Sequence, residues 1–195
     1  MNNPNEVYYR VTFFILWLIY LIVRLFYQRQ IKTSTEYTRV NENQEKFLFR
    51  IFSLAYLLLV LYFLTTWIDF ASLNFPQWLR WIGVIISISG IGLFAWSHQA
   101  LGNNWTAILA LAKEHQLVTS GPYRYVRHPM YSAFFVIGAG FFILSANWLL
   151  ALIYFVPLTT MYFARVNKEE QMMIDRFGDE YREYMKKTGR IFPRL

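Results

Sequence analysis

The sequence predicts an all-α integral membrane protein with about five transmembrane helices and further helices at its C-terminus. Of the 195 residues, 56% are hydrophobic and only 16% are charged, whereas soluble domains contain about 45–50% apolar and about 25% charged residues. The apolar residues form long blocks, as in polytopic membrane proteins. Most basic residues stand in the polar segments between these blocks, which is typical of contact with a cytoplasmic leaflet.

The composition and the absence of common motifs exclude several classes of protein. The net charge of +7 could indicate a nucleic-acid partner, but the basic residues adjoin hydrophobic spans, so we expect no nucleic acid. The chain has no cysteine, which excludes disulfides, a thiolate nucleophile and cysteine-ligated zinc. It also contains no HExxH, Walker or GxGxxG motif and no carboxylate-rich cluster, so no metal site is expected. Its first apolar block is too long for a signal peptide, and no small-residue cleavage site follows it.

Three apolar blocks in the first half are predicted to cross the membrane. They are residues 7–27, 47–68 and 78–101, each long enough for the hydrocarbon core. Arg10 and Arg24 lie near opposite ends of the first block, where their side chains can reach the interface. The third block carries small residues that let helices approach closely; these are Gly83, Ser87, Ser89, Gly90 and Gly92.

Two shorter apolar runs follow in the second half, 130–144 and 148–163. The turn residues 145–147 separate them, so we predict a helical hairpin, with Pro157 interrupting its second arm. Residues 165–177 then have helical spacing, Gly178 is a plausible stop, and 179–187 form a second short helix. No repeat or linker is present, so residues 1–195 are expected to form one domain.

The charges predict the orientation of these segments. Segments 29–50, 102–130 and 164–195 hold five, three and eight basic residues, while 69–80 holds one and 145–147 holds none. Five crossings place the three basic segments on one side, which the positive-inside rule makes cytoplasmic. The N-terminus is then expected outside, and the polar segments 102–129 and 164–195 are expected to meet at the cytoplasmic face.

The densest group of functional side chains is residues 121–131, GPYRYVRHPMY. Pro129 disfavours helical dihedrals at His128 but suits the first turn of a helix, so His128 should stand at a helix N-terminus. Backbone amides beside an imidazole suit an anion. His128 could instead satisfy only helix-terminal or backbone groups, but its neighbours Arg127 and Tyr131 favour a ligand-binding role.

A second candidate group is formed by Arg165, Glu169 and Glu170. Arg165 and Glu169 are four residues apart and share a helix face, while Glu170 is rotated from them. An ordinary surface ion pair, worth about 1 kcal/mol or less, is the alternative. These residues directly follow an apolar run, however, and charge at interface depth is often functional. His98 is predicted to be a packed or capping histidine, and the spacing leaves His115 ambiguous. Nothing places a serine beside His128, so no Ser-His-Asp arrangement is expected.

These residues resemble the isoprenylcysteine carboxyl methyltransferase family, within the wider group that includes phospholipid methyltransferases. The resemblance covers about the last 95 residues. It rests on LGNNW at 101–105, HQLVTSGPYRYVRHPMY at 115–131, Arg165 with Glu169 and Glu170, FGDEYREYMKK at 177–187 and Pro193. The order and spacing of these pieces make the signal specific, and the chain resembles a prokaryotic or archaeal homologue of the family. Met130 and Ala133 depart from the family pattern without breaking the expected pocket.

The resemblance implies a membrane methyltransferase that uses S-adenosylmethionine and has no Rossmann domain. Segments 102–129 and 164–195 would form its catalytic region. S-adenosylhomocysteine would be the product formed from the cofactor. The cofactor-binding residues carried over are His115, Gln116, Leu117, Val118, Tyr123, His128, Pro129, Met130, Tyr131, Glu169 and Glu170. Arg165 would bind the methyl acceptor as the catalytic residue. The implied acceptor is the C-terminal carboxylate of a prenylated cysteine, on a small lipidated molecule or a protein, with no metal and no obligate protein partner.

Three alternatives remain at this point. A phospholipid or other amphipathic acceptor is the first. The second is an NADPH-dependent sterol reductase, in which Arg124 and Arg127 could bind the 2′-phosphate. A membrane scaffold without enzymatic activity is the third, and the converging polar residues argue against it.

Overall fold

A computed structural model describes residues 5–29, 50, 59–102 and 116–194 of the chain. The named helices are α1 (Asn5–Arg29), α3 (Gln77–Leu101), α4 (Pro129–Ser145), α5 (Trp148–Phe177) and α6 (Asp179–Lys187), with the 3₁₀ turns η1 (Asp69–Ala71) and η3 (Gly121–Arg124). Across these ranges extended backbone pairs only in isolated bridges, Ser72 with Asn147 and Val126 with Gly189. The predicted all-α class is confirmed.

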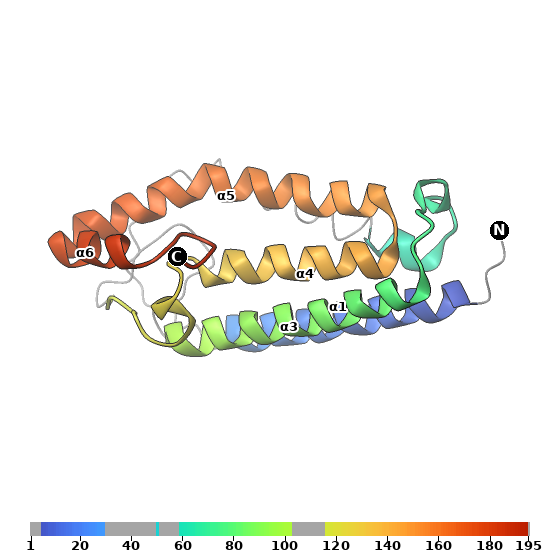
Figure 1. The fold of residues 1–195 in the computed structure, drawn as a ribbon, viewed down its shortest axis with the longest axis horizontal. Coiled ribbons are helices and arrows are strands. Elements are labelled where there is room, and N and C mark those ends of the chain that lie inside the picture. Colours follow the sequence, from blue (N-terminus) through green and yellow to red (C-terminus); the bar gives the residue numbers. More distant parts are fainter. Residues whose placement is uncertain (1–4, 30–49, 51–58, 103–115, 195) are drawn as a thin grey trace.

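The long helices lie roughly parallel in an elongated bundle (Figure 1). Helices α1 and α3 lie together on one side, α4 packs against α3, and α5 lies beyond α4. The end of α3, the start of α4, the end of α5 and helix α6 gather at one end of the bundle. The turn between α4 and α5 and the start of α1 lie at the opposite end.

Three described helices, α1, α3 and α5, are long and apolar enough to cross a membrane. Helix α4 is apolar but has only 17 residues, which corresponds to about 26 Å at 1.5 Å per residue. The second predicted span, 47–68, lies mostly outside the described residues. Residues 121–128 and 164–194 lie outside the predicted apolar stretches, at the polar end of the bundle.

The described end of the second predicted span differs from the prediction. Residues 59–64 are helical, and the helix stops before Thr65 rather than at Ile68. The Arg10 guanidinium from α1 donates to the carbonyl oxygens of Tyr62 at 3.1 Å and Thr65 at 2.7 Å, and it pairs with Asp69. Because Arg10 satisfies carbonyl groups that a further turn would have used, the helix can end early.

Small residues bring α3 and α4 into close contact. A Cβ atom on Gly83 would lie 2.6 Å from the backbone nitrogen of Leu144, and one on Gly140 would lie 2.4 Å from Ser87 Oγ. Side chains at these glycines would therefore force the backbones apart. The predicted close approach holds at Gly83, whereas Gly92 faces open space and plays no such part.

Helices α4 and α5 form the predicted hairpin, with Ala146 in the left-handed region at φ 48°. Asn147 caps α5 by accepting from the Leu150 amide at 3.1 Å, and its Nδ2 donates to the Ile68 carbonyl at 2.8 Å. The expected interruption at Pro157 does not occur. Helix α5 continues through it for 30 residues along a curved path (Figure 1), as expected where proline removes one internal hydrogen bond.

The core between α1, α3 and α4 is rich in aromatic rings. Phe13 packs against Phe141 with ring centroids 4.7 Å apart, and Tyr20 packs against Phe94 at 5.4 Å. His98 is buried there and stacks on Tyr27 at 4.8 Å. The prediction that His98 is a packed histidine is therefore confirmed.

Candidate active site

The motif loop, residues 121–128, lies against the C-terminal tail, residues 188–194. The amide of Arg127 donates to the Gly189 carbonyl at 2.8 Å, and the amide of His128 donates to the Arg190 carbonyl at 2.9 Å. Ser132 Oγ, one turn into α4, donates to the Ile191 carbonyl at 2.6 Å. The two polar segments that were predicted to meet are thus joined by backbone hydrogen bonds.

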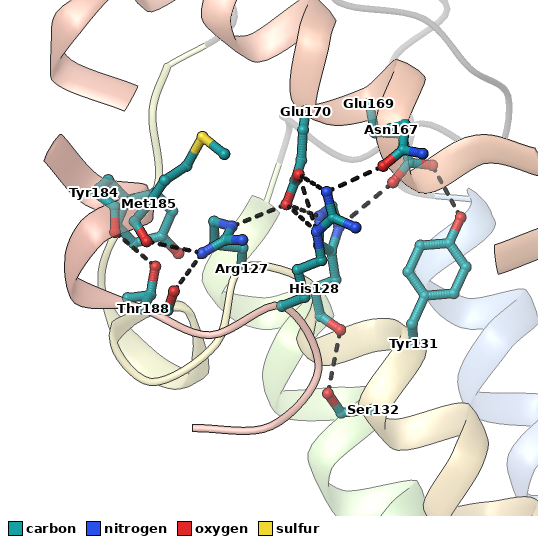
Figure 2. A network of polar contacts seen from close by, with 11 residues as sticks. Arg127, His128, Tyr131, Ser132, Asn167, Glu169, Glu170, Tyr184, Met185 and Thr188 are labelled. Carbon is teal, nitrogen blue, oxygen red and sulfur yellow. Dashed lines mark hydrogen bonds and ion pairs between the residues drawn. The ribbon is translucent and has the colours of Figure 1, made fainter. Parts of the chain in front are cut away.

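His128 stands at the N-terminus of α4 with its ring between two carboxylates. Its backbone is non-helical, at φ −126° and ψ 59°, and Pro129 begins the helix as predicted. The ring Nδ1 lies 3.5 Å from Glu169 Oε2, and Nε2 lies 3.3 Å from Glu170 Oε1. Figure 2 shows the imidazole below α5, facing both glutamates. One histidine from the motif loop therefore links two consecutive residues of α5.

Glu170 is the centre of this network. Its side chain is only 4% exposed, and it accepts from Arg127 Nε at 2.9 Å and from Arg190 Nη2 at 2.7 Å. Burial alone would raise the pKa of this carboxyl group, but hydrogen bonds from His128, Arg190 and Arg127 outweigh burial and lower the pKa to about 2. Glu170 is therefore a buried anchor that is ionised at neutral pH.

Glu169 is the more accessible of the two carboxylates, with 26% of its side chain exposed. It accepts a hydrogen bond from the Tyr131 hydroxyl at 3.0 Å. The Nε atom of Arg165 lies 3.6 Å from Glu169 Oε1, which is an ion pair too long for a hydrogen bond. Residues Arg165 and Glu169 share a helix face, as the sequence spacing predicts.

The electrostatics of the cluster favour an anionic ligand. Burial opposes charge on His128, but hydrogen bonds and attraction from Glu169 and Glu170 raise its pKa above the ordinary value. The two carboxylates therefore favour the imidazolium form of His128. Together with the guanidinium groups of Arg127, Arg165 and Arg190 it makes four cations against the two carboxylates.

Aromatic rings line the side of the site that faces the apolar part of the bundle. The ring of Tyr131 meets that of Tyr162 edge-on at 5.2 Å, and Phe135 meets Tyr162 at 6.0 Å. Tyr131 and Tyr162 pack with Val166 in a buried cluster. The surroundings change from aromatic to ionic between Tyr162 and Arg165, less than one helical turn of α5, which suits a ligand with an apolar and a charged part.

The structure brings five of the predicted site residues into one cluster: His128, Tyr131, Arg165, Glu169 and Glu170. Tyr123 is buried in η3 beside it, and its carbonyl accepts from the Tyr184 hydroxyl at 2.5 Å. Burial, and then the nearby Tyr184 and Glu169, raise the pKa of the Tyr123 phenol.

The remaining predicted residues lie less centrally. Pro129 is fully buried at the start of α4. Met130 packs against the core between α1, α3 and α4 rather than against Glu169 and Glu170. Gln116 is exposed, Leu117 and Val118 are half-buried before η3, and His115 lies outside the described residues.

Two central residues, Arg127 and Arg190, were not among the predicted site residues. Arg127 is adjacent to His128 in the motif, so its position was a signal, and its Nη1 donates to the carbonyl oxygens of Met185 at 3.1 Å and of Thr188. Arg190 lies beyond the last predicted helix, where no periodicity indicates that its side chain turns back to α5. Its proximity to Glu170 follows only from the docking of the tail.

The comparisons with known proteins identify the family of the chain. The model of the isoprenylcysteine carboxyl methyltransferase (ICMT) family matches residues 81–175. Protein-S-isoprenylcysteine O-methyltransferase A of Arabidopsis thaliana is 30% identical over 144 residues, which cover 73% of each chain. The enzyme of that name from Dictyostelium discoideum is 30% identical over 145 residues, covering 73% of this chain and 60% of the relative. For the enzyme from Schizosaccharomyces pombe, the identity is 38% over 81 residues, or 42% of this chain and 34% of the relative.

The chain thus spans between about a third and three fifths of the length of these last two relatives. A solved structure, that of the eukaryotic intramembrane Ras methyltransferase ICMT, shares the fold with a TM-score of 0.59. It is 22% identical in sequence, and the superposition covers 96% of this chain and 71% of that chain. The matched segment contains the motif loop and the glutamate pair, and the relatives match beyond it. The chain belongs to the isoprenylcysteine carboxyl methyltransferase family.

Proposed function

We propose that this protein uses S-adenosylmethionine to methylate the C-terminal carboxylate of a prenylated cysteine within the membrane. One observation carries the proposal: a partly exposed carboxylate, a histidine ring and a guanidinium converge where apolar α5 becomes charged. That boundary suits a substrate whose lipid lies in the bilayer and whose carboxylate lies at the interface. Residues 1–195 would act as a single methyltransferase domain.

The side chains present fit S-adenosylmethionine as the methyl donor. The accessible carboxylate of Glu169 suits an ammonium group, and His128 with the amides at the start of α4 suits a carboxylate. Tyr123, Leu117 and Val118 offer an apolar setting for a purine ring. When bound, the donor supplies a methyl group activated by a sulfonium, and S-adenosylhomocysteine is released after transfer.

Arg165 is the residue that we assign to the methyl acceptor. It lies two residues beyond the apolar stretch that ends at Phe163, and only 12% of its side chain is exposed. A planar guanidinium can fix a carboxylate in one orientation through two parallel hydrogen bonds. Because a carboxylate is already ionised at neutral pH, the protein needs to orient the acceptor and exclude water but not to remove a proton.

The protonation of His128 favours a carboxylate over a phospholipid amine. An amine must lose a proton before or during attack, which calls for a base. His128 lies between two carboxylates that raise its pKa, which favours the protonated form that cannot act as a base. The sterol-reductase alternative is also disfavoured, because Arg127 binds Glu170, the Met185 carbonyl of α6 and the Thr188 carbonyl of the tail, and is not available for a 2′-phosphate.

Methyl-labelled S-adenosylmethionine with a panel of acceptors tests the function. We expect label to enter farnesyl- or geranylgeranyl-cysteine as a base-labile ester, and not to enter the same compounds with a C-terminal amide. Phospholipids with amine headgroups provide the competing arm. Base-stable label in those lipids, with none in the prenylcysteines, would overturn the proposed acceptor.

We further propose that the candidate active site faces the cytoplasm and that the N-terminus lies outside. The support is the distribution of basic residues, five, three and eight on alternate polar segments. The chain has no cysteine, so single cysteines can be introduced at the exposed positions Ser72 and Glu183. In oriented vesicles, an impermeant maleimide should label Ser72→Cys from outside and Glu183→Cys only after the membrane is opened. Labelling of both from one side would contradict the topology.

A further inference from the structure

The C-terminal tail brings Arg190 against His128 from two directions. The Arg190 carbonyl accepts the His128 amide at 2.9 Å. The Arg190 side chain donates from Nη2 at 2.7 Å and from Nε at 3.1 Å to Glu170 Oε2. The other oxygen of Glu170, Oε1, lies 3.3 Å from His128 Nε2. One tail residue therefore holds both the main chain of His128 and the carboxylate that faces its ring.

Arg127 holds one oxygen of Glu170, whereas Arg190 contacts both, with a third contact from its Nε to Oε1 at 3.2 Å. Arg127 Nε binds Oε1 at 2.9 Å, while the shorter contacts of Arg190 are to Oε2. A carboxylate held at one oxygen can still turn about its last side-chain bond, whereas one held at both oxygens cannot. The grip of Arg190 thus determines which way Oε1 points, and it points at His128.

Arg190 acts on His128 through Glu170. Its Nη2 also donates to Asn167 Oδ1 at 3.0 Å, and 44% of its side chain is exposed. Asn167 and Glu170 lie three residues apart on α5, so Arg190 bridges one face of that helix. These side-chain contacts are with α5, and the two shorter contacts to Glu170 are to Oε2, the oxygen turned away from His128.

We propose that Arg190 is a positioning residue, which fixes Glu170 so that His128 stays oriented between its two carboxylates for ligand binding. The identity of the ligand rests on the function proposed above. The coupling of Arg190 to His128 is a property of the tail and can be measured without ligand.

The sign of a titration shift separates this role from two others. The charged and titratable groups around His128 are Glu169, Glu170 and Arg165 of α5, Arg127 of its own loop, Tyr131 of α4, and Arg190 of the tail. If Arg190 positions Glu170, its loss lets that carboxylate turn away and the titration midpoint of His128 falls. If Arg190 is only a nearby positive charge, its loss raises the midpoint. A tail anchor without influence on Glu170 leaves the midpoint unchanged.

The experiment is a nitrogen-15 NMR titration of histidine-labelled protein in detergent. The chain has three histidines, and the His128→Gln variant assigns the relevant signal. We expect Arg190→Gln to lower the midpoint of His128 by about one pH unit. Arg194→Gln is the matched control, since Arg194 lies in the same tail and donates to the Lys186 carbonyl instead; it should leave the midpoint unchanged. A rise or no change in Arg190→Gln overturns the proposal.

Arg190→Lys guards against a variant that fails to fold. It keeps the charge but loses the two-pronged grip, so positioning predicts a smaller fall in the midpoint, whereas a pure charge effect predicts the wild-type value. Unfolding temperatures measured in parallel show whether each variant is folded. A wild-type midpoint in a folded Arg190→Lys protein, together with a raised one in Arg190→Gln, rejects the positioning role.

A double-mutant cycle carries the inference to the ligand. We expect Arg190→Gln and Glu170→Gln each to weaken S-adenosylhomocysteine binding about tenfold, and the double variant to bind no worse than the weaker single one. Effects that multiply would show independent roles and overturn the proposal. If the wild-type protein does not bind S-adenosylhomocysteine, the proposed function fails, and the NMR titration still decides whether Arg190 positions Glu170.

Discussion

The two ends of the bundle both contain buried arginines, but they use them differently. At the end near the α4–α5 turn, Arg80 binds Glu6 at 2.6 Å and Arg10 binds Asp69, so each cation has one carboxylate. Arg80 also donates to the Leu144 carbonyl at 2.8 Å and stacks over the Tyr9 ring at 3.7 Å. At the other end, four cations share two carboxylates around His128.

This difference distinguishes an ion pair that joins helices from an ionic cluster whose excess charge suits a ligand. Arg80 and Arg10 are each paired with one carboxylate, and their remaining donors bind carbonyl oxygens at helix ends. These contacts join the helices at this end of the bundle. The cluster around His128 has excess positive charge and keeps Glu169 partly exposed. Variants at the first end should therefore change stability, and variants at the second should change binding or turnover.

The largest expected effect is the loss of Arg80. Arg80→Ala leaves Glu6 and the carbonyls of Leu144 and Ser145 without this donor. Breaking a buried ion pair costs about 3–5 kcal/mol, and we expect about 3 kcal/mol because Glu6 is partly exposed. Thermal unfolding in detergent measures the loss, with the exposed Arg182→Ala as control. Unchanged stability, or weakened cofactor binding in a folded variant, would contradict the proposed difference between the two ends.

The next effect is on cofactor affinity. His128→Ala and Glu169→Ala should each weaken S-adenosylhomocysteine binding by about 1–3 kcal/mol, the range for leaving a charged partner unsatisfied. Glu170→Ala should do the same, because it removes the second carboxylate facing His128. Calorimetry in detergent gives the affinities, and Arg80→Lys is a control at the opposite end. Wild-type affinity in all three site variants would refute the pocket.

A smaller effect is expected on turnover alone. Arg165→Lys keeps the charge but loses the planar fork, so turnover should fall about tenfold, or about 1.4 kcal/mol, with cofactor affinity nearly intact. Arg165 Nε lies 3.6 Å from Glu169 Oε1. If Arg165 serves only as the ionic partner of Glu169, the lysine variant should have nearly wild-type turnover and cofactor affinity. In that case Arg165→Ala should weaken cofactor binding as much as catalysis. Parallel measurements of affinity and turnover on both variants separate the two accounts.

The smallest effect is the pH dependence of stability. The raised pKa of His128 gives stability that is fully present below its ordinary pKa of 6.5 and is lost as the pH rises through the higher folded value. The lowered pKa of Glu170 gives stability that is present above 4.5 and is lost as the pH falls toward about 2. Both contributions are therefore complete between about pH 4.5 and 6.5.

The His128→Gln variant isolates the histidine contribution. The difference in unfolding temperature between wild type and His128→Gln should be largest near pH 5.5 and should shrink above pH 7. The corresponding difference in free energy of unfolding is about 1.4 kcal/mol for each unit by which the pKa of His128 is raised. Tryptophan fluorescence during heating at pH 5.5 and 8.5 provides the measurement. A difference that grows with pH would mean that His128 is neutral in the folded protein.

Much of the fold follows from hydrophobic block length and turn residues. The apolar blocks 78–101 and 130–144 agree within one residue with α3 and α4, and the short helix 179–187 agrees with α6. The errors arise where tertiary contacts override local pattern. Arg10 ends the second helix early through carbonyls that are more than fifty residues away in sequence, and α5 continues through Pro157 although local pattern predicts an interruption there.

The site was predictable only in part, for a related reason. His128 could be predicted because it lies in the motif at residues 121–131, and Glu169 because it is one helical turn from Arg165. The sequence could not predict that Glu170 is buried and Glu169 accessible. These adjacent glutamates differ in burial only because Arg127 and Arg190 contact Glu170 in the folded protein. The role of Arg190 depends on backbone hydrogen bonds from the motif loop to the tail, and any residue type can make such bonds.

The close contact of α3 and α4 has a consequence for the purified protein. At Gly83 and Gly140 backbone atoms meet directly, and no side-chain rotation can open that seam. Helix α5 meets α4 near the site through rings such as Phe135 and Tyr162, which can turn. Lipid tails give neither seam a hydrophobic advantage over solvation by detergent. Harsh detergents should therefore separate α5 from α4 before they separate α3 from α4. The proposed activity should then be lost while the α3–α4 pair stays intact, and that activity should return when lipid is restored.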